Sequence, residues 1–190
     1  LGFRQPECPG PIADAFAASL PALTWMDETT RQAALVKKGT LAWKIGYPEE
    51  WRDYSKLTIQ RDSLFANAVA ARGFEASRLL AQVGKPVDRK EWGMNAQTVN
   101  ASYNPLQNTF TYPAGILQPP FFHKDFPVAM NLGGMGFVIG HELTHGFDDQ
   151  GSKFDSLGSM TDWWTPASVK GFEERTACID QQYSAYEIEP

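Results

Sequence analysis

The sequence has 190 residues, 43% of them hydrophobic and 13% aromatic, which is enough apolar material for the core of one domain. This composition excludes an intrinsically disordered chain. The formal net charge is -5 and the basic residues are scattered, so no basic stripe is available to bind phosphates, and nucleic acid is excluded as a partner. The longest apolar stretch, residues 127–140, is too short to cross a bilayer, and we expect no membrane contact from this segment.

Helices are predicted throughout the first half of the chain. Residues 1–24 read as a lead-in rich in Pro and Gly, followed by the start of a first helical region. Residues 27–38 form a second helix, with Asp27 as its N-cap. Residues 59–83 have the pattern of a longer helix. Its expected apolar face consists of Leu64, Phe65, Ala68 and Val69.

A change of pattern in the second half predicts a β-hairpin and two further helices. Residues 98–103 and 109–112 are rich in β-branched and aromatic residues, and the segment between them has turn chemistry. Residues 128–148 have the pattern of a buried helix, and a last helix begins at Thr165, its N-cap. The expected fold class is therefore α+β and mainly helical.

Two cysteines, Cys8 and Cys178, are too few for a disulfide scaffold. They could bond to each other, bond to partners outside this segment, or remain as unpaired thiols. The residues alone leave these alternatives open.

The chemistry-bearing pattern is His141-Glu142-Leu143-Thr144-His145, which contains two of the three histidines of the chain. Residues four apart lie on one face of a helix, so two imidazoles placed in this way can both bind one metal ion. Their expected distance from a zinc ion is about 2.0–2.1 Å. Glu142 lies one step round the helix, where its carboxylate can take a proton from a water molecule activated by the metal. This is the HExxH pattern of zinc peptidases.

A chance match is the alternative explanation of this pattern: two core histidines with a solvated glutamate between them. The surrounding sequence disfavours it, because from Asn131 onward the other residues of the predicted helix up to Phe147 are uncharged. Ionisable groups on a buried helix would be costly without a metal ion to pair them. The sequence therefore predicts one zinc ion bound by His141 and His145.

Two acidic residues, Asp148 and Asp149, follow the second histidine closely. Either carboxylate could accept a hydrogen bond from the outward ring nitrogen of a ligating histidine and fix its tautomer. The alternative is a pair of solvated acids at a helix end, where the helix dipole disfavours them. His123 lies in a polar turn outside the helix and is predicted to be a surface residue.

Four stretches of the sequence together resemble the neprilysin family of metallopeptidases, also called M13. The first is VIGHELTHGFDDQG at residues 138–151, and the second is Asn-Ala-Ser-Tyr at residues 100–103, which is similar to the substrate strand of the family. The third is YPAGILQPPFF at residues 112–122. The fourth consists of Trp-Met-Asp at residues 25–27 with Lys-Ile-Gly-Tyr-Pro at residues 44–48.

The resemblance implies that residues 25–190 are part of a zincin catalytic domain of the gluzincin type, with a small sheet beside the active-site helix. Residues 1–24 have no clear match. The resemblance also implies that His141 and His145 bind zinc and that Glu142 is the general base. It further implies that Asn100 and Ala101 bind the backbone of a peptide substrate. The implied activity is endopeptidase cleavage on the amino side of hydrophobic residues, at an extracytoplasmic location. In animal members, a cysteine at the position of Cys178 bonds to one near the C-terminus.

One part of the family's site is not found in this sequence. The family takes its third zinc ligand from a Glu-x-x-x-Asp motif on a helix later than HExxH, and no such motif occurs between His145 and Pro190, where the chain ends. We therefore expect a catalytic domain that is incomplete at its C-terminus, with the third ligand beyond Pro190. Two functions follow: part of a zinc endopeptidase, or a catalytically incompetent peptide-binding fragment that lacks this ligand.

Overall fold

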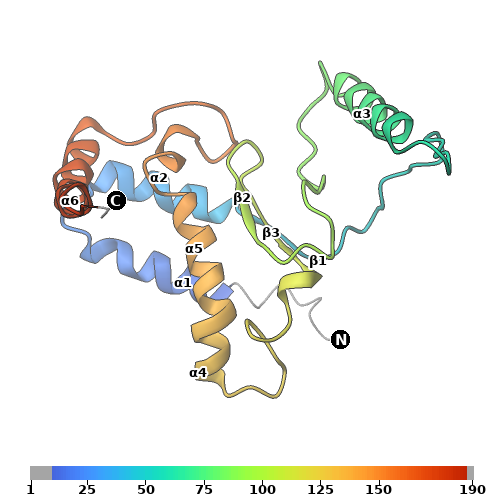
Figure 1. Cartoon of the computed structure of the whole chain (residues 1–190). Coiled ribbons are helices and arrows are strands. Elements are labelled where there is room, and N and C mark those ends of the chain that lie inside the picture. The colour runs from blue at the N-terminus through green and yellow to red at the C-terminus, as the bar shows by residue number, and fades with distance from the viewer. Residues whose placement is uncertain (1–9, 188–190) are drawn as a thin grey trace.

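The structure, a computed structural model, describes residues 10–187, and helices dominate it. The α-helices are α1 (Gly10–Ser19), α2 (Glu28–Gly39), α3 (Leu64–Leu80), α4 (Val128–Asn131), α5 (Phe137–His145) and α6 (Pro166–Ser184). Short 3-10 turns lie at Leu20–Ala22, Ala114–Ile116 and Gly151–Lys153. Figure 1 shows α5 between α1 and a small sheet, with α3 standing apart from the other helices. The predicted fold class is confirmed.

The sheet has three strands, β1 (Ala42–Gly46), β2 (Ser102–Asn104) and β3 (Thr109–Pro113), in the order β1-β3-β2. Strands β2 and β3 are antiparallel, which confirms the hairpin, and Asn108 in its turn has a φ of 47°, a conformation that asparagine tolerates. The prediction of a strand over residues 98–103 was too long, because pairing with β3 begins only at Ser102. Strand β1, which pairs parallel to β3, was not predicted.

Helices α2 and α6 begin at one shared polar junction. Asp27 accepts a hydrogen bond from the Thr30 backbone N–H (2.8 Å), as predicted for an N-cap, and Thr165 caps α6 through the N–H of Ser168 (3.2 Å). The two caps also contact each other, because the Asp27 N–H donates to Ser168 Oγ (3.0 Å) and Thr165 Oγ1 donates to the Asp27 carboxylate. The starts of these two helices therefore hold each other in place.

The prediction for residues 59–83 was wrong in extent and in its apolar face. Helix α3 begins after its N-cap Ser63, because residues before it fold back: the amide of Asn67 bonds to the backbone N–H and carbonyl of Gln60. None of the residues of α3 is buried, and Leu64 is 85% exposed. The apolar pattern therefore indicated a helix correctly but did not indicate a face packed on the core.

The helix predicted at residues 128–148 is interrupted and ends earlier. A π-helical turn at Leu132–Gly136 separates α4 from α5, and α5 ends at His145. In this turn the Met135 N–H donates to the Phe121 carbonyl (2.8 Å), and a Cβ on Gly134 would lie 2.3 Å from the same oxygen. A contact from outside the helix thus accompanies the turn. The segment is also only partly buried, since Phe137 is 69% exposed.

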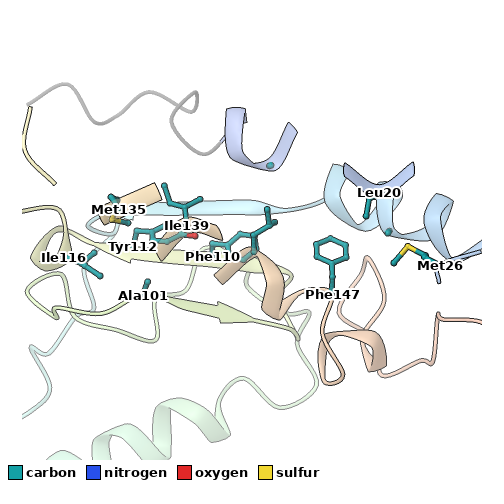
Figure 2. Packing of buried hydrophobic residues seen from close by; sticks show 12 residues of the cluster. Leu20, Met26, Ala101, Phe110, Tyr112, Ile116, Met135, Ile139 and Phe147 are labelled. Atoms are coloured by element: carbon teal, nitrogen blue, oxygen red, sulfur yellow. The ribbon is translucent and has the colours of Figure 1, made fainter. Parts of the chain in front are cut away.

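The hydrophobic core runs from the sheet past α5 to α1 and α2 (Figure 2). At the sheet, Phe110 of β3 stacks on Trp43 of β1 with ring centroids 4.7 Å apart. Next to α5, Phe16 of α1 contacts Phe147 at 4.5 Å. Burial of one face of α5 in this core fixes the helix that carries the histidines. The buried hydrophobic residues shown in Figure 2 include Leu20, Met26, Ala101, Phe110, Tyr112, Ile116, Met135, Ile139 and Phe147.

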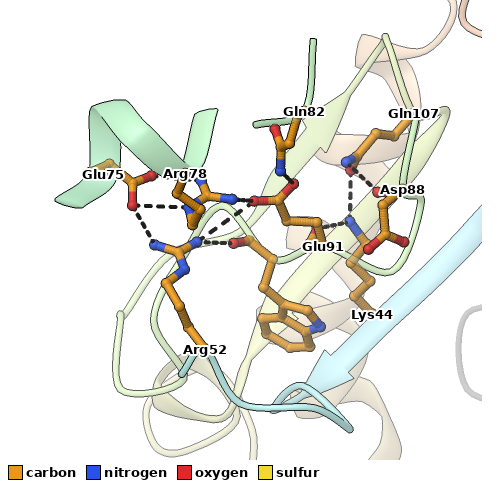
Figure 3. Close-up of polar contacts among 9 residues, drawn as sticks. Lys44, Arg52, Glu75, Arg78, Gln82, Asp88, Glu91 and Gln107 are labelled. Carbon is orange, nitrogen blue, oxygen red and sulfur yellow. Dashed lines mark hydrogen bonds and ion pairs between the residues drawn. The ribbon is translucent and has the colours of Figure 1, made fainter. Parts of the chain in front are cut away.

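Polar contacts connect α3 with the edge of the sheet (Figure 3). Arg78 of α3 pairs with Glu75 one turn earlier and with Glu91, and Arg52 pairs with Glu75 (3.3 Å). Lys44 of β1 donates to the backbone carbonyl of Glu91 and thereby joins the same cluster. Charged side chains, rather than buried apolar ones, therefore anchor α3.

Two further findings concern the membrane and the cysteines. Within residues 10–187, none of the helices combines the length and the apolarity needed to cross a membrane. Cys8 lies outside the described residues, and Cys178 is exposed on α6. The alternatives for their pairing therefore stay as predicted.

Candidate metal centre

His141 and His145 lie on successive turns of α5, with their Nε2 atoms 3.1 Å apart. The rings are nearly perpendicular, at 89°, and their centroids are separated by 4.7 Å. A tetrahedral zinc ion with two nitrogens at about 2.0–2.1 Å would hold those nitrogens roughly 3.3 Å apart. The observed spacing thus fits two ligands of one ion, and the imidazole nitrogens are donors of the type that zinc prefers.

Asp148 lies against the second histidine. Its Oδ2 is 2.8 Å from His145 Nδ1, while its Oδ1 accepts hydrogen bonds from the backbone N–H groups of Gln150 (2.9 Å) and Gly151 (2.8 Å). A carboxylate on Nδ1 favours the tautomer that leaves Nε2 free to bind a metal ion. Asp149 instead accepts a hydrogen bond from the side chain of Gln150. Of the two acids that the sequence singled out, Asp148 is therefore the one that contacts a histidine.

Glu142 is largely buried, with 7% of its surface exposed, beside the two histidines. Burial raises the pKa of its carboxyl group above the usual value. The nearby imidazoles and a backbone hydrogen bond from Tyr103 lower the pKa and so oppose part of this rise. A carboxylate with a raised pKa accepts a proton more readily, as a general base must.

One pocket of about 640 Å³ brings the predicted site residues together. It contains both the HExxH residues of α5 and the start of β2, which is an outer strand of the sheet. Its lining residues are Asn100, Ala101, Ser102, Tyr103, Pro105, His141, Glu142, His145, Asp148, Asp149, Gln150 and Gly151. The side chain of Asn100 accepts a hydrogen bond from the N–H of Ala101 (2.9 Å). His123 lies outside this pocket, with its side chain 43% exposed.

A complete zinc site needs more than these two ligands, because catalytic zinc sites usually have three protein ligands. Among residues 10–187, no group of three or more His, Cys, Asp or Glu side chains is arranged to hold a metal ion. Asp148 cannot be counted as the third ligand here, since both of its oxygens are used by His145 and the backbone. Among the described residues, His141 and His145 could therefore supply only part of a zinc coordination shell.

Sequence reasoning missed one buried charge beneath the pocket. Lys37 suits the C-terminal end of α2 by its charge alone, but its side chain is 1% exposed. Burial lowers the pKa of its ammonium group to about 8, and Asp148 and Asp155 partly oppose this shift. No sequence signal distinguishes it from its neighbour Lys38, whose ammonium group instead pairs with Asp14 (2.6 Å) near the surface.

Comparisons with known proteins agree with this arrangement. The model of peptidase family M13 matches residues 100–190, a range that contains the whole lining of the pocket. Neprilysin-3 of Drosophila melanogaster is 40% identical over 184 residues, covering 93% of this chain and 23% of that protein. Endothelin-converting enzyme 1 of Mus musculus is 42% identical over 184 residues, covering 93% of this chain and 24% of that protein. The chain thus spans about a quarter of the length of these relatives.

Two solved structures have a similar fold. The zinc metalloprotease ZMP1 of Mycobacterium tuberculosis, in complex with an inhibitor, matches with a TM-score of 0.88 and 48% identity over 95% of this chain and 27% of that one. PEPO from Lactobacillus rhamnosis matches with a TM-score of 0.83 and 32% identity over 98% of this chain and 31% of that one. In its motifs, its fold and these matches, the chain is similar to members of peptidase family M13.

Proposed function

We propose that this chain contributes the metal-binding helix and the substrate strand of a zinc-dependent endopeptidase. The observation that carries the proposal is the single pocket in which His141, His145 and Glu142 face the outer strand β2. A relative named Membrane metallo-endopeptidase-like 1 and a solved structure of a zinc metalloprotease support it. We expect the third zinc ligand to come from a part of the parent protein beyond Pro190.

In the proposed reaction, His141 and His145 hold the zinc ion, and Asp148 keeps His145 in the tautomer that binds it. A zinc ion held there supplies Lewis acidity, which makes ionised water available near neutral pH. Glu142 takes the proton of the attacking water and returns it to the amine that leaves when the peptide bond breaks. Its buried position limits the access of solvent to this proton transfer.

The proposed substrates are peptides that bind in extended form. Residues Asn100 and Ala101 precede β2, and a substrate backbone added along this outer strand would pass the HExxH residues. Cleavage on the amino side of hydrophobic residues is our proposal from the family resemblance. An extracytoplasmic location is proposed on the same ground and accords with a relative named Membrane metallo-endopeptidase-like 1.

The decisive experiment uses the full-length natural protein, purified without chelators. We expect about one zinc ion per chain and cleavage of peptides that carry a hydrophobic residue after the scissile bond. Glu142→Gln should keep zinc but reduce cleavage by about 10²–10⁴-fold, the usual contribution of a general base. Glu173→Gln removes the same charge from an exposed position on α6 and should leave cleavage unchanged.

Each result of this experiment is informative. Full activity of Glu142→Gln would remove this residue from the general-base role. A full-length protein that binds peptides through β2 but holds no zinc and cleaves nothing would instead identify a catalytically incompetent peptide-binding protein.

A further inference from the structure

Lys37 is the most deeply buried charged side chain that the proposed reaction does not use. Its ammonium group donates hydrogen bonds to the backbone carbonyls of Gly151 (2.7 Å) and Phe154 (2.6 Å). Both acceptors belong to the loop that follows the HExxH helix. The ammonium group therefore connects the end of α2 with that loop, and Lys37 and Gly151 are 114 residues apart in the sequence.

Aromatic rings from separate segments surround the same ammonium group. It lies 5.8 Å from the ring centroid of Tyr103 in β2, 5.7 Å from that of Phe147 just after α5, and 5.2 Å from that of Trp163 before α6. Such distances are within the range of cation–π attraction. The lysine thus lies among rings from the proposed substrate strand, from the turn just after α5 and from the loop before α6.

The backbone of Gly151 connects this lysine with the proposed metal centre. Its carbonyl accepts from Lys37 and also from Trp163 Nε1 (3.0 Å), while its N–H donates to Asp148 Oδ1 (2.8 Å). The other oxygen of Asp148 contacts His145. A Cβ on Gly151 would lie 2.3 Å from the carbonyl oxygen of His145, so the loop packs directly on the end of α5.

Stability alone does not require a lysine at this position. Burial of an ammonium group carries a desolvation penalty, and an apolar side chain of similar length would avoid it. None of the hydrogen bonds recorded for Lys37 among the described residues goes to a carboxylate. What a lysine can do here and an apolar side chain cannot is bond to the Gly151 and Phe154 carbonyls and so order the loop that follows Asp148.

We propose that Lys37 is a positioning residue that holds Gly151, and through it Asp148, in the place where Asp148 orients the zinc ligand His145. This inference rests on the proposed function, because it assigns the lysine a role in metal binding. The lysine itself touches neither the metal site nor the substrate.

The test is a double-mutant cycle on zinc affinity in the full-length protein, measured by competition with a chelator. Lys37→Met and Asp148→Asn should each weaken zinc binding by about tenfold or more, the usual effect of losing a partner of a metal ligand. The double variant should bind zinc about as weakly as Asp148→Asn alone, since both changes break one chain of contacts. Independent effects would instead multiply.

Lys44→Met is the matched control. Lys44 is also buried and also donates to a backbone carbonyl, but its acceptor Glu91 lies outside the pocket lining, whereas Gly151 belongs to it. It should lower stability without changing zinc affinity. Trp163→Phe removes only the second donor to the Gly151 carbonyl and should weaken zinc binding by a smaller factor. If Lys37→Met does not fold, this variant tests whether the position of Gly151 affects zinc affinity.

The outcomes separate this inference from the proposed function. If the unmodified protein binds zinc and cleaves peptides, but the losses from Lys37→Met and Asp148→Asn multiply, the positioning role is wrong and the endopeptidase assignment stands. Unchanged zinc affinity in Lys37→Met, or an equal loss of zinc affinity in Lys44→Met, would likewise overturn the positioning role of Lys37. If the unmodified protein holds no zinc, the proposed function fails first.

Discussion

Helices α5 and α3 both carry apolar residues, yet different interactions hold them in the molecule. Ile139 and Leu143 of α5 are buried in the core, and this helix contacts both α1 and β2. Helix α3 has no buried residue, and its anchor is the charged cluster around Arg78. Burial thus fixes the helix that carries the two histidines proposed to bind zinc, while ion pairs hold the helix that carries none of the candidate site.

This difference matters for the proposed zinc site, because two side chains can bind one metal ion only if they are held in one geometry. Packing interactions are short-ranged and involve closely fitted side chains, so they define the position of α5 tightly. Exposed ion pairs contribute only about 0–1 kcal/mol each and weaken with salt. The comparison therefore predicts that substitutions in the two helices will have unequal effects.

The largest difference is expected for a matched pair of leucines. Leu143→Ala in α5 removes a side chain that is 2% exposed and should lower the free energy of unfolding by about 3 kcal/mol. Leu64→Ala in α3, at a position that is 85% exposed, should change it by less than about 0.5 kcal/mol. Urea unfolding measures both values. Equal losses would mean that α3 is packed as tightly as α5.

A pair of glycines should shift stability in opposite directions. Gly151→Ala places a Cβ 2.3 Å from the His145 carbonyl oxygen, and the overpacking should destabilise the protein by about 1–3 kcal/mol. At Gly73 in α3 a Cβ meets nothing within 4 Å, so Gly73→Ala should stabilise by up to about 1 kcal/mol. Thermal unfolding of the two variants checks the signs, and a stabilising Gly151→Ala would refute the close packing of the loop on α5.

The smallest effect is expected from the charged cluster. Arg78→Gln removes the partner of Glu75 and Glu91 and should weaken the attachment of α3 by about 1 kcal/mol or less. Hydrogen exchange of α3 amides should become faster, and added salt should produce a similar change in the unmodified protein. Exchange in α5 should not change. If α5 responded equally, the two helices would form one cooperative unit.

Features fixed by neighbours in sequence could be predicted, whereas features fixed by distant segments could not. The caps Asp27 and Thr165 mark the starts of α2 and α6 because each bonds to an N–H three residues later. Strand β1 was missed because its five residues, AWKIG, pair with a strand more than 60 residues away. The π-helical turn escaped prediction since it involves a carbonyl of a preceding loop.

The candidate site divides in the same way. His141, Glu142 and His145 could be identified because helical spacing alone places them together. Asp148 and Asp149 could not be distinguished, since both are within reach of a histidine and only the turn after α5 selects one. The role proposed for Lys37 depends on carbonyls and rings from distant segments, which no local pattern reveals.

The junction between the starts of α2 and α6 has a consequence for the order of folding. The Asp27 N–H finds its acceptor in Ser168, 141 residues along the chain. Forming a contact between such distant residues closes a long loop of chain, and the entropy lost in closing it slows folding. The local hydrogen bond from Thr30 to the Asp27 cap closes no such loop. We therefore expect α2 to gain its first turn early and α6 to dock onto it late, so that a nascent chain would acquire this junction only after the whole of α5 has been synthesised.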